Sequence, residues 1–136
     1  MKHHTRPQIR SSRGATLLEM TIVILVLLTL VGIGVYSSGK ISEWKLGREA
    51  GETLRAVHTA QRLYLADHPT TLVTDITGDD LIPYMKGYNS IPTVESLDGD
   101  QLAIIVNTHP PVVDGGGMTY DPSGKADDSL WDIGQQ

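Results

Sequence analysis

The sequence predicts an α+β protein with a long N-terminal α-helix and a small C-terminal head built on an antiparallel β-sheet. Three observations carry this prediction. Residues 15–36 form an apolar run with one charged residue, Glu19. Residues 37–68 space their apolar positions as an amphipathic helix does. Residues 69–136 hold short apolar runs separated by glycine, proline and aspartate, which is typical of strands and turns.

Charge is distributed unevenly along the 136 residues. Residues 1–14 hold four basic residues and no acid, whereas the remaining 122 residues hold seven basic and sixteen acidic residues, a net charge of -9. An acidic body without a basic patch after residue 62 argues against a nucleic-acid partner. Basic residues ahead of an apolar run instead indicate that the N-terminus stays in the cytoplasm.

The apolar run from Ala15 to Tyr36 has 22 residues. As a helix it is about 33 Å long, which is enough to cross a hydrocarbon core of about 30 Å. No other segment is apolar enough to surround it, so we predict a span of the lipid bilayer. The segment YSSGKISEW after the run is a poor match to a secretory cleavage site. A plain signal anchor and processing between Gly14 and Ala15 stay open.

The stretch RG-ATLLEMTIVILVLLTL resembles a known processing signal. It is similar to the class III signal of type IV pilins and type II secretion pseudopilins. That family has a short basic leader ending in glycine, then a mature N-terminus with glutamate at its fifth position and a long apolar stretch. Counted from Ala15, Glu19 is fifth. The sequence departs from the family at Ala15, where a phenylalanine or another large apolar residue is usual.

The resemblance implies a leader of residues 1–14 that a prepilin peptidase removes by cutting after Gly14, followed by N-methylation of Ala15. Glu19 lies only about 6 Å along the helix from Ala15, so it stays near the headgroups in a lone subunit. In a filament of identical subunits its carboxylate meets the new ammonium of a neighbour. Low dielectric strengthens such a pair. Without the resemblance, a tolerated interfacial acid is an equal alternative.

Residues 37–68 continue the helix along an amphipathic face, and Asp67, His68 and Pro69 end it, because proline disfavours helix at the preceding residue. The positions at helical spacing are Ala50, Leu54, Val57, Gln61, Tyr64 and Leu65.

Two pairs of glycines interrupt the long helix. Gly32 and Gly34 each weaken it by about 1 kcal/mol. This weakness is typical either of close packing between helices or of local unwinding on assembly, and both interpretations stay open. Gly47 and Gly51 form a GxxxG pattern among charged residues, outside the apolar run. We interpret that second pattern as chance.

Residues 69–136 are predicted to form the head. Thr77 is placed to cap a short helix, with Asp80 at its third position. Strands are expected near Ile91–Val94 and Leu102–Val106, joined by a turn at Asp98-Gly99. A third strand is expected near Met118–Tyr120.

The predicted sheet lies over the amphipathic helix, as the resemblance also implies. A turn is predicted at Asp121-Pro122-Ser123-Gly124. Trp131 and Ile133 are expected to pin the C-terminal tail to the sheet.

The tail is rich in carboxylates. Major pseudopilins often bind calcium in such a C-terminal loop, and hard oxygen ligands suit that ion. The spacing matches no EF-hand, so acids that cap solvated turns are the preferred interpretation and calcium is the alternative. The candidate ligands are Asp121, Asp127, Asp128 and Asp132.

Sequence patterns for catalysis are absent. The chain has no cysteine and no G-x-S-x-G, H-E-x-x-H, Walker A or dinucleotide-binding motif. Apart from the adjacent pair His3 and His4, the histidines are not at metal-ligand spacing, and we expect that pair to leave with the leader. The others are His58, His68 and His109. We therefore predict a structural subunit and not an enzyme.

Together these features predict a subunit of a type II secretion pseudopilus. It is held in the inner membrane with its head in the periplasm, and it then polymerises. The resemblance implies further partners, namely an inner-membrane assembly platform and minor pseudopilins. A type IV pilus pilin is the near alternative. A single-pass membrane-anchored binding module is the alternative from another class.

Overall fold

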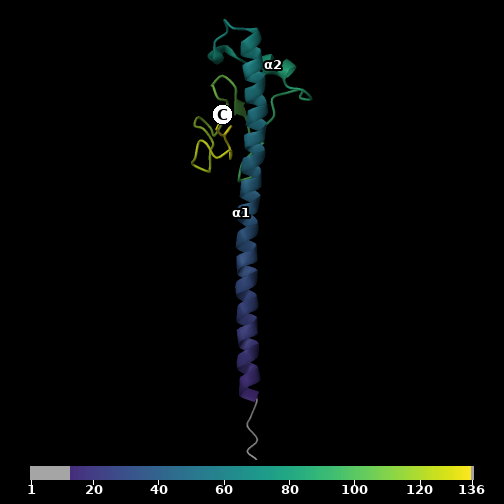
Figure 1. The fold of residues 1–136 in the computed structure, drawn as a ribbon, viewed down its shortest axis with the longest axis vertical. Helices are drawn as coiled ribbons and strands as arrows, with labels where there is room; N and C mark the ends of the chain where they lie inside the picture. The colour runs from purple at the N-terminus through teal and green to yellow at the C-terminus, as the bar shows by residue number, and fades with distance from the viewer. Residues whose placement is uncertain (1–12, 136) are drawn as a thin grey trace, which may run out of the picture. The chain divides into compact units, whose positions relative to one another are not determined.

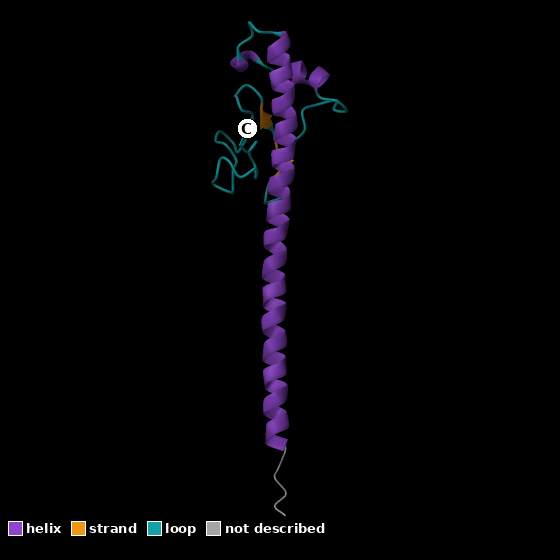
Figure 2. Ribbon diagram, viewed as in Figure 1, coloured by secondary structure: helices purple, strands orange, loops and turns teal. Residues whose placement is uncertain are grey.

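The computed structural model describes residues 13–135, with side chains from Thr16 onward, so most of the predicted leader lies outside the described residues. One long helix, α1 (Arg13–Asp67), is followed by short elements in loops (Figures 1 and 2). The chain is therefore α+β, as the sequence predicts. The short elements are η1 (Val73–Asp75), α2 (Gly78–Leu81), η2 (Ile82–Tyr84), β1 (Val94–Glu95), β2 (Gln101–Leu102), β3 (Ile104–Ile105) and β4 (Val112–Val113).

Helix α1 ends where the sequence places its end. The backbone N–H of His68 still donates to the Tyr64 carbonyl, at 2.9 Å, and Pro69 follows. The helix continues without a break through Gly32 and Gly34. Backbone packing divides the chain after Gly39 into two units, one of residues 1–39 and one of residues 40–136. The second unit is called the head below.

The core of the head forms along one face of α1. Leu54 and Val57 are fully buried, and Ala50 and Ala60 nearly so. This spacing of three and four residues is the helical period that the sequence shows. Side chains from the rest of the head complete the core. They are Ile76, Leu81, Met85, Val94, Ile104, Val113 and Trp131.

The head contains two small sheets instead of the single sheet predicted. Strand β1 pairs antiparallel with β2, and β3 pairs antiparallel with β4. The predicted third strand near Met118–Tyr120 is reduced to one bridge between Asp114 and Thr119. Strand β4 takes its place as the partner of β3. The ladders stay short because Pro110 and Pro111 precede β4 and three glycines follow Asp114.

The predicted caps and turns are confirmed. The backbone N–H and the hydroxyl of Thr77 both donate to the Asp80 carboxylate, at 2.9 and 2.6 Å, and fix the start of α2. Gly99 has φ +89°, a left-handed conformation that glycine adopts without strain, in the turn between β1 and β2. The predicted turn after Asp121 closes through an N–H of Gly124 donating to the Asp121 carbonyl, at 3.3 Å.

The C-terminal tail packs on α1 as well as on the strands, and one sequence-based interpretation is wrong. Trp131 is buried in one core with Val94 and Val113 of the strands, and its backbone N–H donates to the Gly47 carbonyl of α1 at 2.9 Å. The Arg55 Nε donates to the Ile133 carbonyl at 2.9 Å. The GxxxG pattern of Gly47 and Gly51, which we interpreted as chance, has a packing role against the tail. A methyl group on Gly47 would lie 2.8 Å from the Trp131 ring nitrogen, and one on Gly51 would lie 2.5 Å from the Ser129 carbonyl oxygen.

We expect Gly51→Ala to destabilise the head by about 1–3 kcal/mol, because the added methyl group meets tail backbone that must shift. Gly39→Ala is the matched control, since it changes another glycine of α1 that has no such neighbour. The measurement is urea unfolding of the detergent-solubilised chain, followed by the near-ultraviolet circular dichroism of the tryptophans. A midpoint for Gly51→Ala at or above that of the parent chain contradicts the packing role.

Candidate functional site

The first candidate site is the apolar part of α1. By length and composition this helix is able to cross a membrane. Its large hydrophobic side chains from Leu17 to Tyr36 are all 48% to 73% exposed. The hydroxyls of Thr21 and Thr29 donate to the carbonyls of Leu18 and Val26, at 2.7 and 2.8 Å. These bonds satisfy two polar groups within the helix, as an apolar surrounding requires.

Glu19 lies within this exposed apolar stretch. Its side chain is exposed, and it is the only charged residue between Ala15 and Tyr36. Gly14 and Ala15 belong to the first turn of α1, and the structure describes only their backbone. The carboxylate is therefore positioned on the helix surface, one turn after the predicted cleavage point. Once water is removed, an ionised carboxylate on an apolar surface is unfavourable in free energy unless a positive charge from outside the subunit pairs with it.

The second candidate site is the C-terminal loop with its predicted calcium ligands. Asp121 accepts from the N–H and the hydroxyl of Ser123, at 3.0 and 2.7 Å. Asp128 accepts from the Leu130 N–H at 2.9 Å. Asp127 accepts from the Gln135 amide at 3.1 Å. These carboxylates organise the turns of the tail. Among residues 13–135 no three histidine, aspartate or glutamate side chains are grouped to hold a metal ion. Calcium stays a hypothesis.

Asp132 differs from the other aspartates of the loop. Its Oδ1 accepts from the N–H groups of Ser129 and Gly134. Its Oδ2 is buried without a hydrogen-bond partner. Burial raises the pKa of Asp132 above its ordinary value of 3.8, the two backbone hydrogen bonds oppose this, and the charges of Asp128 and Asp121 add to it. The loop thus gathers negative charge around one poorly solvated oxygen.

The third cluster comprises Gln61, His109 and His58, and it was not predicted. Gln61 is fully buried, and its amide donates to the carbonyls of Val106 and Thr108, at 2.9 and 2.7 Å. His109 Nδ1 donates to the Gln61 Oε1 at 2.9 Å, in the tautomer that pairs them. The rings of His58 and His109 lie 4.9 Å apart. The network ties the loop before β4 to α1. The sequence signal was the three-residue spacing of His58 and Gln61.

Comparison with protein-family models, with curated proteins and with solved structures finds no match to this chain.

We expect the stability of the head to fall as the pH drops below about 6.5. Burial first, then the positive charges of His109 and Arg62, lower the pKa of His58 below its ordinary value of 6.5. A base with a lowered folded-state pKa stabilises the fold above its unfolded pKa, and this contribution is lost as the pH falls through its folded pKa. Thermal unfolding across this range measures the effect. His58→Gln should flatten the pH dependence and His68→Gln should not. Equal slopes in all three chains refute the assignment.

We expect Asp132→Asn to remove a second, opposite pH dependence. Because the folded-state pKa of Asp132 is raised, its contribution is present below about pH 3.8 and is lost as the pH rises through the folded value. The parent chain should therefore lose stability relative to Asp132→Asn on going from acid to neutral pH.

The same pair of chains tests calcium. A bound ion should raise the thermal midpoint of the parent chain at neutral pH and leave Asp132→Asn unchanged. A midpoint that neither calcium nor a chelator moves counts against the calcium hypothesis.

Proposed function

We propose that this chain is a prepilin-type structural subunit that is cleaved after Gly14, methylated at Ala15 and polymerised into a filament through its apolar helix. One observation carries the proposal. An apolar helical surface of membrane-spanning length is exposed, and its single charge, Glu19, lies at the fifth position from the predicted new N-terminus. In a plain membrane anchor, the Glu19 carboxylate would have no role in assembly.

Processing would change the electrostatics of the helix. The uncut chain has a peptide bond at Ala15, whereas the cut chain has an ammonium there. Filaments assemble by an axial stagger of identical subunits, which brings the ammonium of one subunit to the Glu19 carboxylate of the next. In an apolar bundle an unpaired charge is strongly unfavourable, by about 3–5 kcal/mol when one partner of a buried pair is removed. The pair therefore selects one register among many apolar contacts of similar strength.

The filament we propose is the type II secretion pseudopilus. Before assembly, the subunit is held in the inner membrane with its basic N-terminus in the cytoplasm and its head in the periplasm. Its partners would be other copies of itself, the prepilin peptidase, the inner-membrane assembly platform and minor pseudopilins. Small size and the absence of cysteine from the head favour the pseudopilus over a type IV pilus. Assembly thereby drives protein export.

The proposal predicts different fates for two carboxylate variants of α1. Glu19→Ala should still be cut after Gly14 and carry a methylated Ala15, but it should incorporate poorly into filaments because the register-setting charge is gone. Glu49→Ala is the matched control, since it removes an exposed carboxylate of the same helix outside the apolar run. It should be cut and assembled like the parent chain.

Intact-mass spectrometry of the membrane-extracted chain measures processing, and sedimentation of sheared filaments measures assembly. A native chain that still begins at Met1 refutes the processing step and favours a membrane-anchored binding module. Normal incorporation of Glu19→Ala refutes the role of the carboxylate.

A further inference from the structure

The loop between β3 and β4, residues 106–111, is tied to α1 by the side chain of Gln61. The Gln61 amide nitrogen donates to the carbonyls of Val106 and Thr108, at 2.9 and 2.7 Å. Its Oε1 accepts from His109 Nδ1 at 2.9 Å. Three hydrogen bonds from one fully buried side chain therefore hold this loop against the helix.

These hydrogen bonds fix the protons of His109. The two carbonyls use both hydrogens of the Gln61 amide, so its oxygen can only accept, and His109 must carry a proton on Nδ1. A further proton then binds at Nε2 and turns the ring into a cation. Because His109 is exposed, it can take up this proton while the loop stays closed.

His58 belongs to the same cluster but is only 5% exposed. Its ring centre lies 4.9 Å from that of His109, and Arg62 follows one turn later on α1. Burial first, then the positive charges of His109 and Arg62, lower the pKa of His58 below its ordinary value of 6.5. Arg55, one turn earlier, donates to the Ile133 carbonyl of the tail. The closed loop therefore favours the neutral form of His58.

A charged His58 can be hydrated only if something that covers it moves. The helix is the less mobile side, because His58 lies on it directly after the fully buried Val57. The exposed residues 107–109 of the loop are the more mobile side. Pro111 is fully buried and anchors the end of the loop beside β4, so these three residues can move while β3 and β4 stay paired.

We infer that Gln61, His58 and His109 form a pH-sensitive latch, which holds the loop against α1 at neutral pH and releases residues 107–109 in mild acid. On release, a proton from water binds to His58, and the three hydrogen bonds of Gln61 are exchanged for hydrogen bonds with water. The face of α1 around His58 is then uncovered, so the head offers a different surface in acid. Because the cluster lies within the head, this inference is independent of the cleavage and assembly of the apolar helix.

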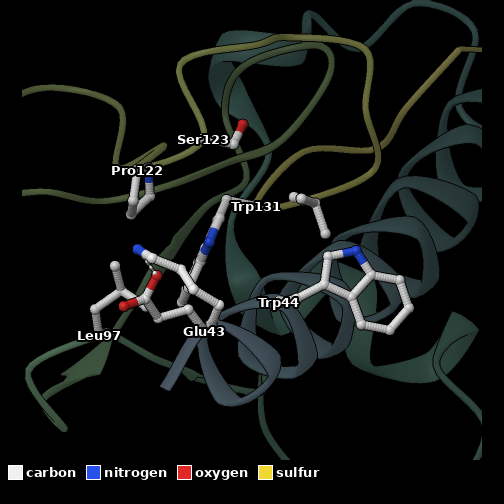
Figure 3. A pocket seen from close by; sticks show the side chains of 8 residues that line it. Glu43, Trp44, Leu97, Pro122, Ser123 and Trp131 are labelled. Atoms are coloured by element: carbon white, nitrogen blue, oxygen red, sulfur yellow. Dashed lines mark hydrogen bonds and ion pairs between the residues drawn. The ribbon is translucent and has the colours of Figure 1, made fainter. Parts of the chain in front are cut away.

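The two tryptophans of the chain lie elsewhere in the head and report on its overall packing. Both line a groove between α1 and the C-terminal loops (Figure 3). Trp44 precedes His58 by 14 residues, which is about 21 Å along the helix. The backbone of Trp131 donates to Gly47, which also lies well before His58 on α1. Release of the loop should therefore leave the near-ultraviolet circular dichroism of the tryptophans unchanged.

The chain contains no cysteine, so two spin labels can be attached at introduced cysteines. Asn107→Cys with Leu63→Cys spans the latch, because Asn107 is exposed on the loop and Leu63 is 49% exposed on α1. Tyr88→Cys with Leu63→Cys is the control pair, since Tyr88 is exposed in the head outside the loop. Pulsed electron double resonance on the full-length chain in detergent micelles measures both label distances between about pH 7.5 and pH 5.

We expect a second, longer distance to grow at the latch as the pH falls below about 6.5. One proton taken up on release raises the ratio of open to closed chains by up to tenfold per pH unit, until His58 is also charged in the closed state. The control pair and the tryptophan signal should not change. Return to neutral pH should restore the single distance.

Histidine variants of the labelled chain identify the group that binds the proton. His58→Gln should remove the pH response. His109→Gln should make it smaller, because one of the charges that act on His58 is lost. Since His109 is exposed, this second variant is expected to fold even if His58→Gln does not. His68→Gln is the matched control and should respond like the parent chain.

Three results would overturn the latch. The first is a latch distance that does not change down to about pH 5. The second is an undiminished change in His58→Gln or, if that variant does not fold, in His109→Gln. The third is a change at both label pairs together with loss of the tryptophan signal, because acid then unfolds the head as a whole.

Discussion

The apolar surface of α1 between Leu17 and Tyr36 is the constraint on which the rest of this molecule depends. Its fifteen exposed large hydrophobic side chains are unfavourable in water, because burying one side chain of this size is worth about 1.5–3 kcal/mol. In the proposed function, lipid would cover this surface in a lone subunit and neighbouring helices would cover it in a filament. Glu19 is the only charged side chain of the run, so in that proposal it alone would gain a counter-charge on assembly.

The later part of α1 has a different role, because it forms part of the core of the head. A unit of this size has too few residues for a deep core of its own, so it uses α1 as one wall. Leu54, Val57 and Ala60 supply that wall, and the strands are only two residues long. Buried hydrogen bonds from Gln61 then fix the loop before β4, and the tail is fixed at Gly47. Order in the head therefore comes from contacts with α1 more than from sheet ladders.

The sequence predicted the features that depend on local chemistry. Pro69 ends the helix, and Thr77 with Asp80 forms a capping box, because both effects act within a few residues. It did not predict features made by distant residues. The partner of β3 lies beyond a Pro-Pro pair, which hid β4, and the contacts of His58 with His109 join positions far apart in the chain. In the candidate site, the position of Glu19 follows from spacing alone, whereas the burial of Asp132 Oδ2 depends on how the tail folds.

The glycines of α1 fall into two groups, which differ in whether other atoms of the chain pack against them. At Gly47 and Gly51 the missing side chains leave a notch, and the tail of the same chain fills it. At Gly32, Gly34 and Gly39, an added methyl group would meet no atom of the described residues within 4 Å. Glycine weakens a helix by about 1 kcal/mol, so three open positions are a disadvantage to the isolated subunit. They become useful when another backbone approaches closely, as small residues allow between membrane helices. In the proposed filament, Gly32 and Gly34 would allow such an approach by a helix of another subunit, and local unwinding on assembly is the other interpretation that stays open.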